Sequence, residues 1–222
     1  MIALALELSS RHGSAALLSG QEILAEETWD EKDFRGQHVF TVLPGMLRKA
    51  SVSLEVVDVF AVGRGPGSYS GMRVAITAAQ AFALPGRKTV YTLSSGEALA
   101  QEVADREKVS PIAIVGDARR GTVWFGVFEN RDQGLAQVKS WTVLAPDKLT
   151  AELPPGTLVV SPDWQKLSPV LKGLNLKCLE QDHFPKARIV GQLALRKLEL
   201  GLPSEPLVPI YTQPAVLKLA GA

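Results

Sequence analysis

The sequence predicts an α/β fold, in which short buried strands alternate with amphipathic helices. Residues 1–105 read as three strands followed by alternating helices and strands, in the order β-β-β-α-β-α-β-α. A glycine-rich segment at 63–71 lies between an apolar run and an alanine-rich run, which is typical of a strand, a loop and a helix in succession. The chain has 222 residues and is 46% hydrophobic, enough for a large core.

The first half contains several short apolar runs and three stretches of helical spacing. Strands are expected at 2–8, 14–18, 23–28, 56–62 and 89–92, with a hairpin turn at 19–22. Helices are expected at 38–50, at 71–83 and from a capping-box motif at 94–97 to residue 104. Pro44 predicts a kink or a broken start in the first helix. The polar stretch 29–37 is expected to be an exposed loop.

The second half begins after a charged connector at 105–110 and again mixes strands with helices. Strands are expected at 111–115, 122–128, 138–144, 158–160 and 176–179. Helices are expected at 146–153 and 188–200, followed by a proline-rich extended tail at 203–214. The sequence shows no internal repeat. We therefore expect two units, an N-terminal lobe of residues 1–105 and a C-terminal α/β lobe of residues 106–222.

Composition limits the function classes. The 24 basic and 23 acidic residues give a net charge of +1, so nothing predicts unaided binding to nucleic acid. Cys178 is the only cysteine, which forbids an internal disulfide and fits a reducing compartment. The N-terminus lacks the basic start of a signal peptide, and no apolar run is long enough to span a membrane. A cytoplasmic protein without a membrane partner is expected.

The glycine loop at 63–71 permits two interpretations. A tight loop before a helix presents free N–H groups, so Gly65, Gly67, Ser68, Ser70 and Gly71 are weak candidates for a phosphate site. The loop matches neither the P-loop motif G-x-x-x-x-G-K-[ST] nor the dinucleotide-binding motif G-x-G-x-x-G, and no lysine follows it. The alternative is a plain strand-to-helix turn with another segment packed against it. Ser68 and Ser70 are then expected to cap the helix.

Other catalytic or metal sites have weaker signals. His12, His38 and His183 do not share a ligand spacing, so no metal site is expected. A nucleophile elbow is not expected, because Tyr69 occupies the central position of the Gly-x-Ser-x-Gly pattern. Glu7 and Asp117 end strands in the two halves and could hold Mg²⁺ over a cleft, but two ordinary turn residues are the more common case.

Two of the predicted helices carry broad apolar stripes. A core helix packed on a sheet explains one side of each. Two such helices in a small domain present more apolar area than one core consumes, and small side chains permit close helix contact. The more specific hypothesis is that these two helices form a surface that binds a helix of a partner. The residues expected at this interface are Val39, Val42, Leu43, Met46, Met72, Ala75, Ile76 and Ala79.

Five segments, taken in order, resemble one protein family. They are ALALELSS at 3–10, QH at 37–38, GRGPGSYSGMR at 63–73, DARRGTVW at 117–124 and PIY at 209–211. Together they are similar to the TsaB (YeaZ) family over nearly the whole chain, and the glycine loop is the specific part. Segment 129–184 matches no feature of the family that we can assign.

The resemblance implies an actin-like (ASKHA, ribonuclease-H-like) fold of two α/β lobes with mixed sheets flanked by helices. It implies a non-catalytic cytoplasmic subunit in the formation of N6-threonylcarbamoyladenosine (t6A) at adenosine 37 of tRNA. In that family TsaD holds the metal and transfers the threonylcarbamoyl group, TsaB pairs with it through two helices, and the ATPase TsaE joins them. This chain would need no cofactor and would meet tRNA only through the complex. ATP or ADP at the complex interface, and a homodimer without TsaD, are both compatible with the resemblance.

The first strand departs from the family pattern. Glu7 and Leu8 stand where the family usually has Asp followed by Thr or Ser. In actin-like ATPases this turn approaches the nucleotide phosphates and magnesium, so the change argues against independent nucleotide binding. The alternative function is an actin-like phosphotransferase or ATPase acting on its own. It predicts magnesium-dependent nucleotide binding that is sensitive to changes at Glu7 and Asp117.

Overall fold

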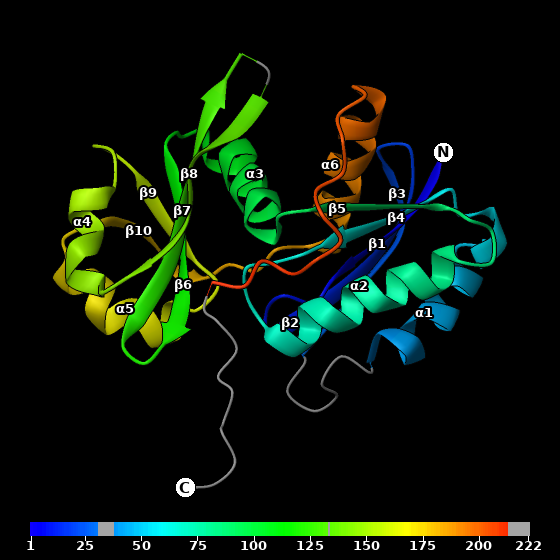
Figure 1. The fold of residues 1–222 in the computed structure, drawn as a ribbon, viewed down its shortest axis with the longest axis horizontal. Helices are drawn as coiled ribbons and strands as arrows, with labels where there is room; N and C mark the ends of the chain where they lie inside the picture. The colour runs from blue at the N-terminus through cyan, green and yellow to red at the C-terminus, as the bar shows by residue number, and fades with distance from the viewer. Residues whose placement is uncertain (31–37, 133, 213–222) are drawn as a thin grey trace, which may run out of the picture.

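The computed structural model describes residues 1–30, 38–132 and 134–212. Two lobes stand side by side, each built on one five-stranded mixed sheet with helices on both faces (Figure 1). The predicted α/β class is therefore confirmed. Most of the predicted loop at 29–37 lies outside the described residues, and Trp29 and Asp30 belong to a strand instead.

The two sheets have the same topology. The first consists of β1 (Ile2–Glu7), β2 (His12–Ser19), β3 (Glu22–Asp30), β4 (Val59–Gly63) and β5 (Thr89–Leu93), in the order β3-β2-β1-β4-β5. The second consists of β6 (Ile112–Arg119), β7 (Thr122–Arg131), β8 (Gly134–Leu144), β9 (Leu158–Ser161) and β10 (Lys177–Asp182), in the order β10-β9-β6-β7-β8. In each sheet the three strands that come first in the chain are antiparallel, each to the next of the three. The two strands that follow them in the chain run parallel to the first strand. The chain thus repeats one β-β-β-α-β-α-β-α unit, as an actin-like fold requires, although the sequence shows no repeat.

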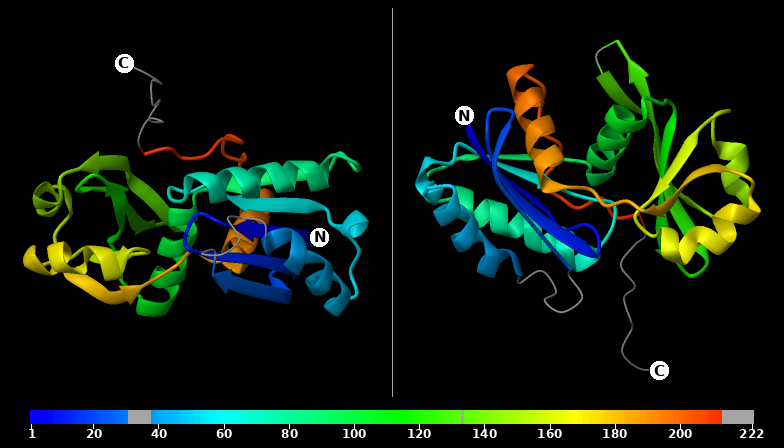
Figure 2. Two further views of the ribbon diagram at one scale, coloured as in Figure 1. Left: turned by 90° about the horizontal axis from the view of Figure 1, so that it is seen from below. Right: turned by 180° about the vertical axis from the view of Figure 1, so that it is seen from behind.

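Helices cover both faces of each sheet (Figure 2). They are α1 (His38–Lys49), α2 (Tyr69–Ala83), α3 (Ser95–Glu107), α4 (Leu149–Glu152), α5 (Trp164–Gly173) and α6 (Ala187–Glu199), with 3₁₀ turns at Leu54–Val56 and Pro146–Lys148. In β1, Leu4 and Leu6 point toward α1 and α2, whereas Ala3 and Ala5 point toward α6. This alternation follows from the two-residue period of a strand. The small side chains let α6 lie close to the sheet.

The last helix of each unit packs on the sheet of the other lobe. Leu99 and Val103 of α3 belong to the core of the second sheet, and Val190 and Ala194 of α6 belong to the core of the first. The two helices also contact each other between the lobes. The division of the chain at 105/106 stays a prediction, and the contacts of these two helices cross it.

Several elements differ from the sequence-based expectation. Helix α5 was not predicted, the strand predicted from residue 56 begins at residue 59 after a 3₁₀ turn, and β8 begins four residues early. Helix α1 runs through Pro44 without interruption. The hydroxyls of Ser68 and Ser94 cap α2 and α3, as expected, whereas Ser70 lies inside the first turn of α2 and was wrong as a cap. Within the described ranges, no helix has the length and apolar content needed to cross a membrane.

Candidate functional site

The glycine loop between β4 and α2 is packed against the turn that follows β1. The Ser68 N–H donates to the Ser9 carbonyl (2.6 Å), and the Gly65 N–H donates to the Ser95 hydroxyl (2.8 Å). The Gly71 N–H donates to the Ser68 hydroxyl (3.3 Å). Three of the N–H groups that could have bound a phosphate are therefore already bonded within the protein.

The glycines permit this close packing. A Cβ atom on Gly67 would lie 2.0 Å from the Ser9 carbonyl oxygen, and one on Gly71 would lie 1.9 Å from the Leu8 carbonyl oxygen. Backbone atoms cannot move aside as flexible side chains can, so these positions exclude larger residues. This geometry explains the glycines through the second interpretation, in which a plain strand-to-helix turn has another segment packed against it. Phosphate binding at this loop stays a prediction.

A cavity of about 210 Å³ lies between the lobes beside this loop. It is lined by the β1–β2 turn, the glycine loop, the start of α3 and the second sheet, through residues that include Arg11, Gly67, Ser95, Asp117, Arg119 and Asp163. Glu7 is not among the lining residues. Its carboxyl group is buried, Oε1 accepts a hydrogen bond from the Ser9 N–H (2.6 Å), and Oε2 has no hydrogen-bond partner among the described residues. Burial raises the pKa of Glu7, which favours a neutral carboxyl group.

Asp117 does line the cavity, but its polar atoms are engaged. Its carboxylate forms an ion pair with Lys166, and its N–H donates to the Asp163 carboxylate (2.9 Å). Burial raises the pKa of Asp163. The structure does not bring Glu7 and Asp117 to one cavity. Across residues 1–30, 38–132 and 134–212, no three His, Cys, Asp or Glu side chains gather as a metal site would require.

Arg11, which lines this cavity, ties the two lobes together. Its guanidinium group pairs with Asp182 (2.5 Å), donates to the Gln165 side chain (3.2 Å) and lies over the Phe184 ring, 5.1 Å from the centroid. No sequence signal predicted this contact, because the partners lie more than 150 residues away. A charged side chain that lines the cavity thus links the two lobes.

The residues predicted for the partner interface require a correction. Seven of the eight are buried in the core of the first lobe, and Val42 is half-buried. The buried residues are Val39, Leu43, Met46, Met72, Ala75, Ile76 and Ala79. Their apolar stripe faces the sheet of the same molecule, because a strong stripe marks the side that packs on the core. The seven buried residues are therefore not exposed as contact residues in this fold, whereas Val42 stays a prediction.

The opposite sides of α1 and α2 remain uncovered by the described chain. We call them the helical face. Phe40 is 50% exposed, Leu84 just beyond α2 is 75% exposed, and Thr77 is an exposed residue near the middle of α2. Phe40 and Phe82 contact each other edge to face across the two helices, with ring centroids 6.1 Å apart. The helical face thus presents large apolar side chains to solvent in the isolated chain.

A C-terminal segment adds to this face. Residues 202–212, which we call the strap, form neither helix nor strand and return across the first lobe to the start of α2 (Figure 1). The Arg64 guanidinium group pairs with Glu205 (2.5 Å) and donates to the Val208 carbonyl (2.8 Å), while the Ile210 N–H donates to the Arg64 carbonyl (2.8 Å). The glycine-loop arginine therefore holds the strap in place.

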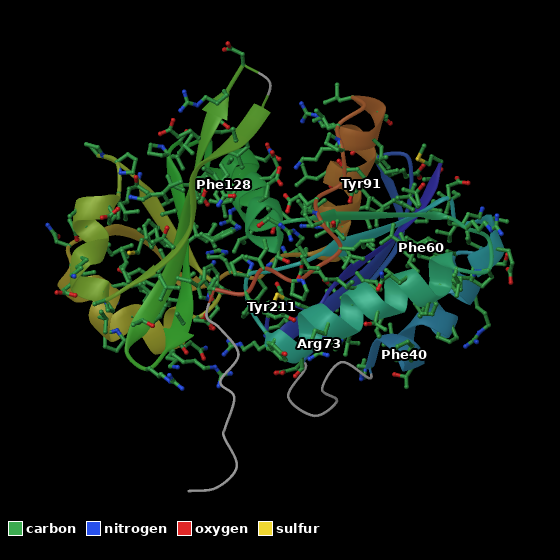
Figure 3. The ribbon with its side chains drawn as sticks, viewed as in Figure 1. Phe40, Phe60, Arg73, Tyr91, Phe128 and Tyr211 are labelled. Atoms are coloured by element: carbon green, nitrogen blue, oxygen red, sulfur yellow. The ribbon has the colours of Figure 1, made fainter. Side chains whose placement is uncertain are left out.

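The strap carries Tyr211 to the N-terminal end of α2. The Tyr211 ring stacks on Tyr69, with centroids 5.1 Å apart and planes at 30°. Arg73 donates to the Tyr69 hydroxyl (3.0 Å). Figure 3 shows Tyr211 and Arg73 beside this end of α2, with Phe40 farther along on α1. The tyrosine pair therefore lies at one end of the helical face.

Replacing Arg64 by alanine is expected to release the strap. The variant loses an ion pair and two hydrogen bonds at a largely buried side chain, so we expect a loss of about 1–2 kcal/mol of local stability. Faster hydrogen exchange at residues 203–211 would report it. Arg106→Ala, which removes an exposed pair with Glu107, is the control and should change stability by less than ~0.5 kcal/mol. Unchanged exchange in the Arg64 variant would contradict the assignment.

Comparisons with known proteins agree with this geometry. The family model described as "TsaD: tRNA N6-adenosine threonylcarbamoyltransferase" matches residues 37–172. Two relatives named tRNA threonylcarbamoyladenosine biosynthesis protein TsaB are similar in sequence. The one from Haemophilus influenzae is 32% identical over 125 residues, covering 55% of this chain and 51% of the relative. The one from Buchnera aphidicola subsp. Baizongia pistaciae is 29% identical over 118 residues, covering 51% and 53%. The chain thus spans about half the length of the curated relatives it matches.

Solved structures extend the similarity to nearly the full chain. YeaZ from Pseudomonas aeruginosa aligns with a TM-score of 0.79 at 24% identity, covering 95% of this chain and 100% of that one. A P. aeruginosa protein described as similar to peptidase YEAZ aligns with a TM-score of 0.82 at 23% identity, covering 96% and 99%. Such likeness shows the fold alone, which is a two-lobed actin-like α/β protein. With the family match, the chain belongs to the TsaD family and, within it, to the TsaB (YeaZ) type.

Proposed function

We propose that this chain is a non-catalytic cytoplasmic subunit that binds a TsaD-type protein and activates it in t6A formation on tRNA. The helical face is the observation that carries the proposal, because large apolar side chains there are left uncovered by the described fold. The names of the similar proteins support the pathway, since they are biosynthesis proteins for this modified nucleoside. The catalytic step would take place in the TsaD-type partner.

Activation would act through conformation. A subunit that binds one conformation of its partner more tightly than another shifts the partner toward that conformation. The two lobes of this chain are tied by Arg11 and by Glu102, which accepts hydrogen bonds from Lys186 and Arg188. A protein whose two lobes are tied in this way can hold α1 and α2 in a fixed position for the partner to bind. The complex would also include TsaE and would bring tRNA to the catalytic subunit, with no cofactor required by this chain alone.

The alternative, an independent actin-like phosphotransferase or ATPase, has less support. Its loop N–H groups already donate to protein acceptors, and the cavity of about 210 Å³ is smaller than the ~300–1,000 Å³ typical of ligand pockets. Calorimetry of the isolated chain with ATP and Mg²⁺ separates the two functions. Binding that is lost in Glu7 and Asp117 variants would favour the alternative.

Replacing Thr77 by glutamate is expected to disrupt the complex. Thr77 is exposed near the middle of α2, so a new charge there would have to be desolvated when the helical face is covered. We expect binding of the TsaD-type protein from the same organism to weaken about tenfold or more, with a parallel loss of stimulated t6A formation.

The matched control is Thr142→Glu, which places the same change on an exposed residue of β8 in the other lobe. It should leave binding and stimulation unchanged. Calorimetry of the pair and a reconstituted modification assay provide the measurements. Failure of the wild-type chain to bind, or modification at full rate without it, would refute the proposed function.

A further inference from the structure

A second cavity lies between the lobes, on the side where the hairpin of β7 and β8 projects beside α6 (Figure 1). Its volume is about 600 Å³, against about 210 Å³ for the cavity beside the glycine loop, and falls within the ~300–1,000 Å³ typical of ligand pockets. The hairpin forms one wall, the C-terminal half of α6 forms the other, and α3 lies between them. We call this cavity the hairpin groove. A ligand bound in it would contact both lobes.

Leucine side chains form the apolar part of the hairpin groove. Leu135 of β8 and Leu193 of α6 line it from opposite walls, and Leu200 and Leu202 line it where α6 ends. Leu200 is 62% exposed and Leu202 is 46% exposed. A single exposed leucine is ordinary, but these exposed side chains converge on one cavity. The hairpin groove therefore offers apolar surface to the body of a small ligand.

The charged side chains that line the hairpin groove balance one another. Three are cationic and three are anionic, namely Arg131, Arg196, Lys197, Glu97, Asp132 and Glu205. Lys197 pairs with Glu97 (2.6 Å), and Glu205 pairs with Arg64 (2.5 Å). Arg131 pairs with Glu129 (2.6 Å). A lining with no net charge does not attract polyanions such as RNA, because phosphate neutralisation needs an excess of cations.

Arg196 and Asp132 are the charged groups of the groove that form no ion pair with any residue of the described chain. Both are exposed, Arg196 on α6 and Asp132 in the turn between β7 and β8, so they line the groove from opposite walls. Although their charges are opposite, they do not pair with each other. A guanidinium group is suited to bidentate pairing with a carboxylate, and a carboxylate is suited to pairing with an ammonium group.

We propose that the hairpin groove binds a small zwitterion with an apolar body. Its carboxylate pairs with Arg196, its ammonium group pairs with Asp132, and its body packs on the leucine side chains. Amino acids with apolar side chains and their short peptides have this chemistry. The inference goes beyond the proposed function and does not depend on it, because neither charged residue belongs to the helical face or the strap.

NMR titration of the isotopically labelled full chain tests the site. The probes are leucine and leucyl-leucine, which distinguish a free amino acid from a peptide as the ligand. We expect saturable chemical-shift changes that map to the β7–β8 hairpin, α3 and the C-terminal half of α6. The N-acetylated form of the same probe lacks the cation, and its amide lacks the anion. Each derivative should bind about fivefold more weakly.

Variants of the two charged residues show which end of the ligand each one binds. Arg196→Gln should weaken the zwitterion about fivefold and leave the amide unaffected, whereas Asp132→Asn should weaken the zwitterion about fivefold and leave the N-acetylated form unaffected. Misfolding would weaken every probe and would not reproduce this pattern. The matched controls are Arg120→Gln and Asp147→Asn, which change exposed residues that do not line the groove. They should bind every probe as the wild type does.

Three results would overturn the inference. The first is the absence of saturable shifts with both zwitterions at ~10 mM. The second is binding that maps to the glycine-loop cavity, or that neither Arg196→Gln nor Asp132→Asn weakens. The third is a stability coupling between Arg196 and Asp132 in a double-mutant cycle without ligand, because it would show that the two side chains pair with each other in solution. None of these results would affect the proposed function, which is tested by binding of the TsaD-type protein.

Discussion

Replacing Gly71 by alanine is expected to destabilise the protein by about 3 kcal/mol and to lower its melting temperature by roughly 6–12 °C. The added Cβ would lie 1.9 Å from the Leu8 carbonyl oxygen, and that carbonyl belongs to the backbone just after β1. Relief would require α2 and the β1–β2 turn to move apart. The Ser68 N–H bond to Ser9 (2.6 Å) lies at the same contact and would be weakened too.

Gly45→Ala is a matched control, because Gly45 is also a helical glycine. No heavy atom lies within 4 Å of its added Cβ, so the substitution should be neutral or stabilising by up to about 1 kcal/mol through helix propensity. Thermal and urea unfolding of the two variants give the comparison. Similar stability changes in both would contradict the close-packing account of the glycine loop.

Strong periodicity predicted the elements of this fold well but not their partners. The stripe that includes Val39 and Ile76 correctly predicted two amphipathic helices, and it faces their own sheet. A surface that binds another protein has a weaker pattern, because it must also tolerate water in the free chain. The exposed Phe40, which lies off the stripe, was the better signal for the helical face.

Contacts between residues that lie far apart in the chain could not be predicted from the sequence. The exchange of α3 and α6 between lobes brings together residues such as Lys197 and Glu97 (2.6 Å), which lie a hundred residues apart. Helix α5 was missed because it is short and contains Pro169, although Trp164, Leu167 and Leu171 form its buried side. A local pattern of ten residues with an internal proline does not favour a helix until a sheet is present to cover its apolar side.

Glu7 is the site of the second large effect. Its carboxyl group is fully buried, and it fills the space left by the missing side chain of Gly63. Glu7→Ala is expected to cost about 2–4 kcal/mol, because it leaves a cavity and removes the acceptor of the Ser9 N–H. Glu7→Gln keeps the shape and the acceptor oxygen, so it should remain folded at neutral pH with a stability at least equal to that of the wild type.

The pH dependence distinguishes a neutral carboxyl group from a charged one. Burial raises the pKa of Glu7 above its ordinary value of 4.5, although the Ser9 N–H bond and the nearby hydroxyls of Ser9 and Ser95 oppose this shift. Between these two pKa values the native state holds a proton that the unfolded chain releases, so wild-type stability falls as pH rises through that window. Glu7→Gln lacks this dependence. The wild type should therefore lose stability relative to Glu7→Gln as urea unfolding is repeated from pH 4.5 upward, and parallel pH curves for the two proteins would show that the Glu7 carboxyl group is charged in the fold.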